Sequence, residues 1–133
     1  MSHVFLDTVG MIAVWDDTDQ WHRAAHDAYR ALVARGRSLV TTSLVLCECG
    51  NAAARRPYRT DVNELRKFLV QEQLLVDPTL EEVEEAWAAF DRGEAGEAGI
   101  VDHLSFRVMR RLGLTDAFTN DRHFQAAGFK TLF

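Results

Sequence analysis

The chain has 133 residues, of which 47% are hydrophobic and 26% charged, and its formal net charge is -5. This size and composition predict a single domain over residues 1–133 with a core of its own, and they exclude a disordered chain. The negative net charge excludes a protein that coats nucleic acid by bulk attraction, so a polyanionic partner would need a local basic patch and metal ions.

The amino-terminal apolar run at residues 4–6 ends at Asp7. A run of this length is too short for a signal peptide or a membrane span. Cys47 and Cys49 are two positions apart in a predicted helix, where their side chains point in different directions and do not suit a disulfide. We therefore expect a soluble, cytoplasmic protein without a membrane partner.

Short apolar runs and segments of helical spacing alternate along the chain. In chain order they predict a strand at 4–6, helices at 10–15 and 20–35, a strand at 39–42, helices at 44–56 and 60–73, a strand at 74–76, helices at 79–91 and 100–112, a strand at 117–119, a helix at 121–126 and a candidate fifth strand at 129–133. Ser43 and Thr79 are the predicted N-caps of two helices, and the glycine-rich segment 93–99 is a predicted loop.

Strands that alternate with helices predict an α/β fold, here a three-layer α/β/α sandwich with a central, mostly parallel sheet of four to five strands. Right-handed crossovers place helices on both faces of such a sheet. Ligand sites in these folds gather beyond the carboxyl ends of the strands. Residues directly after the predicted strands are therefore the first candidates for a functional site.

Two aspartates occupy that position. Asp7 directly follows the first predicted strand, and Asp121 follows the strand at 117–119. Aspartate is also a leading N-cap residue, so each of them taken alone is explained equally well as the cap of the next helix. Their interpretation as site residues depends on further acids at the same edge of the sheet.

Two more acids lie on helix faces that we expect to be buried. Glu48 is the only charged residue in the segment 43–54, which has almost no polar face, and Asp102 falls on the inward side of the helix at 100–112. An unpaired ionised carboxylate in such a place costs several kcal/mol unless it is protonated or binds a cation. For Asp102, a hydrogen bond to Ser105 or to the backbone is the alternative.

If these four acids converge, their charges repel one another by a few kcal/mol at separations of about 4 Å. A bound divalent cation resolves that conflict. Oxygen ligands without nearby cysteines or paired histidines favour Mg2+ or Mn2+ over Zn2+. The sequence therefore predicts a site for Mg2+, or alternatively Mn2+, formed by Asp7, Glu48, Asp102 and Asp121.

Four segments resemble the PIN-domain nucleases, and within them the VapC-type toxins of bacterial toxin–antitoxin pairs. They are Val4-Phe-Leu-Asp-Thr8, Glu48-Cys-Gly-Asn51 with Arg55, Val101-Asp-His-Leu-Ser105 and Phe118-Thr-Asn-Asp-Arg-His-Phe124, and together they span nearly the whole chain. By this resemblance, the catalytic and metal-binding positions of the family are Asp7, Glu48, Asp102 and Asp121. Thr8, Ser105 and Thr119 resemble its supporting hydroxyls, and Asn51 and Arg55 resemble residues that support the acids or contact substrate.

The resemblance implies a small α/β/α fold and metal-dependent endonucleolytic hydrolysis of single-stranded RNA, with 3′-hydroxyl and 5′-phosphate ends on the products. It also implies a homodimer and a cognate antitoxin that covers the acidic groove, as in a type II toxin–antitoxin pair. A housekeeping RNA-processing nuclease, or a PIN fold that binds RNA or protein without catalysis, is the alternative. An aspartyl-phosphate phosphotransferase needs a second acid two residues after the first, where this chain has Val9.

Several further polar residues are left outside the predicted site. Asp116 fits an exposed turn before the strand at 117–119, and Glu94 is a solubilising charge in the glycine-rich loop. His22 and His26 have i, i+4 spacing, but no glutamate-containing zinc motif surrounds them. We expect both histidines to face solvent.

Overall fold

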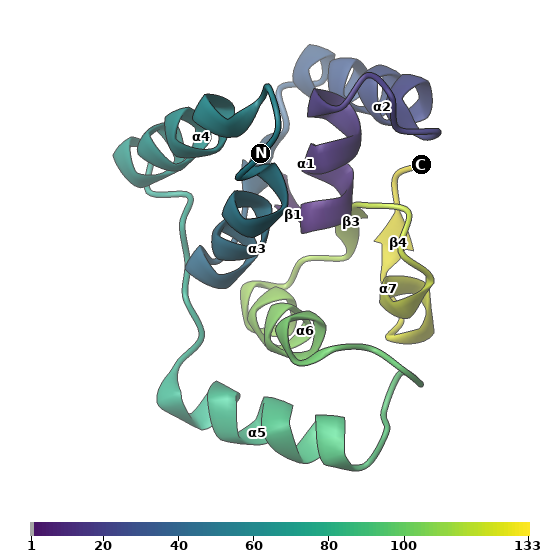
Figure 1. Ribbon diagram of the computed structural model, residues 1–133. Coiled ribbons are helices and arrows are strands. Elements are labelled where there is room, and N and C mark those ends of the chain that lie inside the picture. The colour runs from purple at the N-terminus through teal and green to yellow at the C-terminus, as the bar shows by residue number, and fades with distance from the viewer. Residues whose placement is uncertain (1) are drawn as a thin grey trace.

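The computed structural model describes residues 2–133, and these residues form seven helices and four strands (Figure 1). In chain order the elements are β1 (His3–Leu6), α1 (Thr8–Trp15), α2 (His22–Ala34), β2 (Ser38–Val40), α3 (Ser43–Ala53), α4 (Arg59–Gln71), α5 (Leu80–Asp91), α6 (Ile100–Leu112), β3 (Asp116–Phe118), α7 (Arg122–Ala126) and β4 (Lys130–Thr131). The predicted alternation of strands and helices is confirmed.

The four strands form one parallel sheet in the order β2-β1-β3-β4. β1 pairs with β2 on one side and with β3 on the other, where Leu6 lies opposite Phe118. Because every pair is parallel, the chain leaves all strands at the same edge of the sheet. The segments that follow β1, β2 and β3 therefore meet at this edge, as the predicted fold requires.

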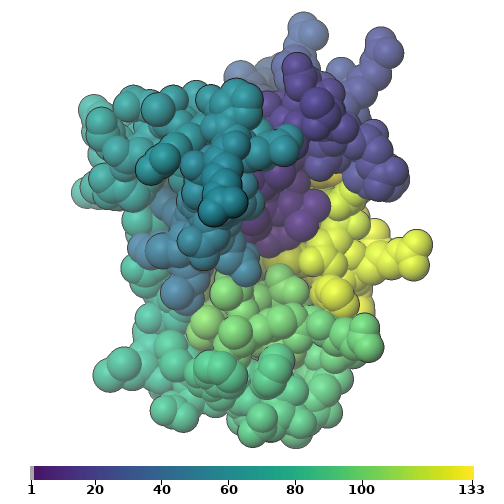
Figure 2. All heavy atoms as spheres, viewed as in Figure 1, coloured from purple at the N-terminus to yellow at the C-terminus, as the bar shows by residue number. Residues whose placement is uncertain are grey.

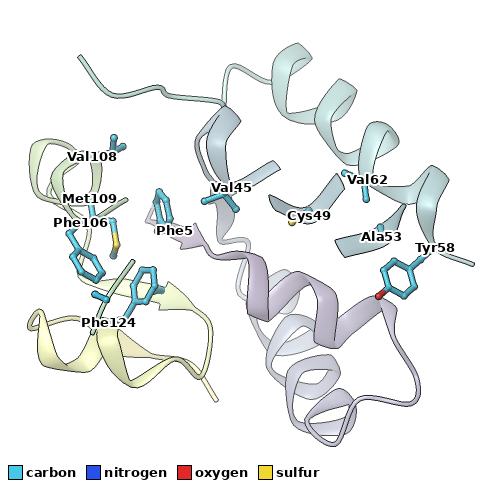
Figure 3. Packing of buried hydrophobic residues seen from close by; sticks show 12 residues of the cluster. Phe5, Val45, Cys49, Ala53, Tyr58, Val62, Phe106, Val108, Met109 and Phe124 are labelled. Atoms are coloured by element: carbon cyan, nitrogen blue, oxygen red, sulfur yellow. The ribbon is translucent and has the colours of Figure 1, made fainter. Parts of the chain in front are cut away.

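Alternate side chains of β1 face opposite layers of helices. Phe5 packs into a core cluster with residues of α3, α6 and α7, among them Phe106 and Phe124 (Figure 3). Val4 and Leu6 pack on the other face of the sheet, against α1 and α2. This two-residue alternation is the normal geometry of a strand. It gives the three-layer α/β/α arrangement that the sequence predicts.

α5 packs on α6 along the lower edge of the molecule in Figure 2. It begins at the predicted cap, where Thr79 accepts a hydrogen bond from the Glu82 N–H and donates its own N–H to the Glu82 carboxylate. The same carboxylate accepts hydrogen bonds of 2.9 and 3.0 Å from Arg111 of α6. Because Glu82 is buried, this pair fixes α5 against α6, the helix that carries Asp102.

The prediction of a strand at 74–76 is wrong. This segment makes only an isolated parallel bridge, between Leu75 and Thr41. β2 ends at Val40 and α3 begins at Ser43, so only the short stretch between them adjoins the 74–76 segment, and Thr41 alone pairs with it. The sheet consequently has four strands, and the candidate fifth strand at 129–133 supplies one of them as β4.

The predicted N-cap of α3 is also wrong by one residue. Thr42 is the last extended residue, and its hydroxyl accepts a hydrogen bond of 3.2 Å from the Val45 N–H. Ser43 instead donates its hydroxyl and its N–H to the carboxylate of Asp77. The helix ends at Ala53 rather than at residue 56.

Within residues 2–133, no helix is both long enough and apolar enough to cross a membrane. Cys47 is exposed, Cys49 is buried, and both are free thiols. The prediction that these two cysteines do not pair is therefore confirmed.

The packing of α1 against the sheet requires the absence of a side chain at Gly10. A Cβ atom built at this position would lie 2.0 Å from the backbone oxygen of Phe118, far inside van der Waals contact. The close approach sets the start of α1 against the end of β3, where the Asp7 N–H donates to the same Phe118 oxygen at 3.5 Å. Gly10 thereby helps to position Asp7.

Gly10→Ala is expected to lower the free energy of unfolding by at least about 2 kcal/mol, because the added methyl group must push α1 away from β3. Gly50→Ala is the matched control, since Gly50 also lies within a helix and nothing lies within 4 Å of its added Cβ. This control should be neutral or stabilise the protein by up to about 1 kcal/mol. Urea denaturation measures both variants, and equal stabilities would contradict the assigned contact.

Candidate metal centre

The segments after β1 and β3 direct polar side chains toward the layer of α3 and α6. Phe5 faces this layer, and Asp7 follows two residues later with its backbone still extended, so both side chains point in the same direction. Thr119 lies at a bend just after β3, and its hydroxyl donates a hydrogen bond to the Asp7 carboxylate. Asp7 and Thr119 therefore lie on the side of the sheet that α3 and α6 cover.

Asp7 is buried, with 3% of its surface exposed. Its carboxylate accepts a hydrogen bond of 2.8 Å from Thr119 Oγ1, which in turn accepts one of 3.1 Å from the Asp121 N–H. Thr119 thus joins the two aspartates that follow strands. Although Asp7 occupies the N-cap position of α1, its side chain makes no capping hydrogen bond, so the alternative that it is only a helix cap is wrong.

Glu48 reaches the same region from α3. Its Oε1 accepts a hydrogen bond of 2.8 Å from Thr8 Oγ1. Because Thr8 is the first residue of α1 and directly follows Asp7, this bond ties α3 to the place where the first strand ends. Thr8 therefore makes the kind of contact expected of a supporting hydroxyl.

Asp102 and Asp121 meet at a histidine. His123 Nδ1 lies 2.9 Å from Asp121 Oδ1 and 4.0 Å from Asp102 Oδ2. One nitrogen or oxygen atom from each of the three residues lies within 4.8 Å of the other two. Asp121 also caps α7 by accepting from the His123 N–H at 2.9 Å, and Asp102 accepts from the Gly99 N–H at 3.2 Å. The capping role considered for Asp121 is real, and it coexists with this cluster.

The four carboxylates influence one another electrostatically. Burial is the largest cause that raises the pKa of Asp7 from its ordinary 3.8 to about 7; the Thr119 hydrogen bond opposes it, and the charges of Asp102 and Asp121 add to it. Burial likewise raises the pKa of Asp102 to about 6, with contributions from the charges of Asp121 and Glu48. The structure thus gathers all four predicted acids, an arrangement that is unfavourable for the ionised groups unless a cation joins them.

Three of the predicted supporting residues make no hydrogen bond to these acids within the described part of the chain. Asn51 is exposed on α3, and Arg55 is exposed just beyond the end of that helix. Ser105 is buried, but its hydroxyl donates to the Val101 carbonyl at 2.8 Å within α6. The alternative of a bond between Asp102 and Ser105 is therefore not realised, whereas the alternative of a backbone bond is.

The acids left outside the predicted site have other partners. Asp116 lies at the opposite end of β3, where it pairs with Arg37 at 2.9 Å. Glu94 pairs with the neighbouring Arg92 in the loop before α6. Neither residue belongs to the acidic cluster.

His123 is the residue of this cluster that the sequence analysis misses. It lies in a helix of only five residues, so no helical periodicity indicates where its side chain points. Its place two residues after Asp121 is the available signal. Of the other histidines considered, His26 is exposed as expected, but His22 is half-buried, with Nδ1 2.8 Å from the Ala13 carbonyl oxygen.

The donor atoms suit a divalent cation that prefers oxygen. Carboxylates from four different elements or their ends offer oxygen atoms on this side of the sheet, and two of them accept hydrogen bonds from threonine hydroxyls. Mg2+ and Mn2+ are the ions that such a set binds in proteins. His123 adds one nitrogen atom to this set.

The sequence matches the PIN domain over residues 4–130, which is nearly its full length. The chain therefore belongs to the PIN-domain family. Both the parallel sheet and the acids beyond its carboxyl edge agree with this assignment.

Similarity to individual proteins narrows the assignment of the chain within this family. The chain is 30% identical over 127 residues to the 23S rRNA-specific endonuclease VapC20 of two Mycobacterium tuberculosis strains, covering 95% of each chain. The crystal structure of M. tuberculosis VapC20, named as a sarcin-ricin loop cleaving toxin, has a TM-score of 0.75 at 27% identity, also over 95% of each chain. The crystal structure of PAE2754 from Pyrobaculum aerophilum has a TM-score of 0.57 at 25% identity and covers 99% of this chain and 92% of that chain. The chain is thus a VapC-type member of the PIN-domain family.

Neutralising Asp7 is expected to stabilise the metal-free protein at alkaline pH. Its pKa is about 7 in the folded protein and ordinarily 3.8, so the folded state favours the protonated carboxyl group. The stability associated with this proton is fully present below about pH 4 and is lost as the pH rises through 7. In excess chelator near pH 8, Asp7→Asn should raise the free energy of unfolding by roughly 1–3 kcal/mol.

Chemical denaturation of the wild type and the variant near pH 5 and near pH 8 measures this difference, which should be much smaller at the lower pH. Asp17→Asn, which changes an exposed acid, controls for the overall change in charge. A variant that is less stable than the wild type at alkaline pH would show that ionised Asp7 is not under electrostatic stress.

Proposed function

We propose that the protein is a divalent-cation-dependent endoribonuclease. The observation that carries this proposal is the convergence of four acids at the carboxyl edge of the sheet, where burial and neighbouring charges raise the pKa of Asp7 and of Asp102. A cation site in this position suits the hydrolysis of phosphodiester bonds. Similarity over 95% of the chain to a protein named as an rRNA-specific endonuclease supports RNA as the substrate.

The residues that would hold the ion, Mg2+ or Mn2+, are Asp7, Glu48, Asp102 and Asp121. When bound, such an ion lowers the pKa of a coordinated water and neutralises negative charge on the phosphate. The chain itself fixes the ligands in advance: Thr8 holds Glu48, and Thr119 holds Asp7. Ligands oriented in this way do not have to reorganise when the ion and the RNA arrive.

Arg55 and Asn51 are the proposed contacts to RNA. Asn51 follows Glu48 by one helical turn on α3, and Arg55 lies in the turn just beyond the end of that helix. Arg55 is exposed and makes no ion pair within residues 2–133, whereas the next residue, Arg56, pairs with Asp16 at 2.6 Å. An unpaired guanidinium suits a phosphate, and in a chain of net charge -5 such local cations matter for binding RNA.

We further propose that the protein is the toxin of a type II toxin–antitoxin pair. In this proposal it acts as a homodimer, and a cognate antitoxin covers the acidic cluster. The support is its similarity to VapC20 in sequence and in structure, over 95% of both chains. The sarcin-ricin loop named for the related structure is accordingly the first RNA to test.

The purified protein should cleave an RNA that carries the sarcin-ricin loop in the presence of Mg2+ or Mn2+, and excess chelator should abolish the cleavage. Asp7→Asn and Asp102→Asn should each lower the rate by roughly a hundredfold or more, because each removes a charge that holds the ion. Electrophoresis of end-labelled RNA measures these rates.

Asp116→Asn is the matched control, because this acid pairs with Arg37 at the opposite end of β3. Its rate should stay within about twofold of the wild-type rate, since it lies outside the cluster. Cleavage at the wild-type rate by both Asp7→Asn and Asp102→Asn would exclude the proposed centre.

Arg55→Gln should weaken the binding of single-stranded RNA and lower the slope of log affinity against log salt concentration by about 0.7, because one phosphate contact is lost. The titrations use the Asp7→Asn background, which prevents cleavage. Arg30→Gln removes an exposed arginine from α2 and should leave the slope unchanged. Identical slopes for the two arginine variants would remove Arg55 from the RNA-binding surface.

A further inference from the structure

His123 faces two carboxylates of the acidic cluster at once. Its Nδ1 lies 2.9 Å from Asp121 Oδ1 and 4.0 Å from Asp102 Oδ2, while 37% of the side chain stays exposed. Within residues 2–133, these three residues form the one group of three or more ligand-bearing side chains with the spacing of a metal site. A nitrogen atom is therefore part of the cluster from which a cation would take its ligands.

The start of α7 does not by itself explain this orientation. Asp121 caps the helix through the backbone N–H of His123, so the imidazole is not needed for the cap. The segment before the helix is also fixed, because the Asp121 N–H donates to Thr119 Oγ1. With its backbone held in this way, the partly exposed side chain of His123 has room to point into solvent, yet its ring lies against Asp121 and near Asp102.

We propose that His123 is a nitrogen ligand of the site's cation, together with Asp102 and Asp121, and that it makes the site prefer Mn2+ to Mg2+. The inference rests on the proposed function, because it adds a ligand to the same cation site. It replaces the all-oxygen ligand set expected from the sequence with a mixed set of oxygen and nitrogen.

The preference follows from the chemistry of the two ions. Mg2+ is a hard ion that takes oxygen ligands and demands near-ideal octahedral geometry. Mn2+ shares the affinity of Mg2+ for carboxylates, but as the softer transition ion it accepts an imidazole nitrogen more readily than Mg2+ does. Because a neutral imidazole adds no negative charge, it also completes the site without adding to the repulsion among the acids.

The test measures ion binding directly, on the full chain without RNA. Titration with Mn2+ followed by electron paramagnetic resonance gives the Mn2+ affinity, and competition with Mg2+ gives the second affinity. Pulsed measurements on the bound Mn2+ report whether a nitrogen nucleus is coordinated. The wild type should bind Mn2+ more tightly than Mg2+ and show coupling to one imidazole nitrogen.

Two variants separate loss of the ligand from loss of the fold. His123→Gln should abolish the nitrogen coupling and lower the ratio of Mn2+ to Mg2+ affinity roughly tenfold. His123→Asp restores an oxygen ligand, so it should keep the Mg2+ affinity at or above the wild-type value while the nitrogen coupling is lost. His26→Gln, which changes an exposed histidine of α2, should alter neither property.

No nitrogen coupling in the wild type, together with an unchanged affinity ratio in His123→Gln, would overturn the inference and leave His123 as a hydrogen-bond partner of Asp121. Failure of the proposed function has a different signature, in which Asp102→Asn binds both ions as tightly as the wild type does. A wild type that coordinates Mn2+ through nitrogen but cleaves no RNA would support the ligand and contradict the nuclease.

Discussion

The burial of carboxylates beside one another at one edge of a parallel sheet is the constraint on which the rest of this structure depends. Asp7 is almost fully buried, and its pKa of about 7 expresses how strongly the site resists its charge without a cation. Two threonine hydroxyls stabilise the charged carboxylates in part, because each donates a hydrogen bond to one of them. A bound divalent ion would compensate the remaining negative charge. The same ion is needed for the proposed hydrolysis, so the unfavourable arrangement of the acids serves the proposed activity.

The scaffold around the cluster is built to keep the acids together. Gly10 lets the start of α1 approach the backbone of β3 so closely that no Cβ fits. On the other side, the ion pair between buried Glu82 and Arg111 holds α5 against α6. Both contacts fix elements that carry an acid or adjoin one, so the position of the carboxylates depends on packing several residues away from them.

Much of this arrangement could be predicted from the sequence, because it follows from regular geometry. The strand ends locate Asp7 and Asp121, and the helix faces locate Glu48 and Asp102, since periods of two and 3.6 residues determine which side chains point inward. Where no period operates, the prediction fails. The orientation of His123 depends on a helix of five residues, and the segment at 74–76 looks like a strand but finds only one partner residue. Ser105 is buried as expected, yet its hydroxyl donates a hydrogen bond to a carbonyl of its own helix. The spacing of residues does not predict which acceptor a buried serine hydroxyl uses.

The most direct test of the account is the anomalous scattering of Mn2+ in crystals of the wild-type protein grown without RNA. A peak is expected at the carboxyl edge of the sheet, among the carboxylates of Asp7, Glu48, Asp102 and Asp121. Carboxylates that point apart in the electron density, or a peak that forms only elsewhere on the surface, would contradict it.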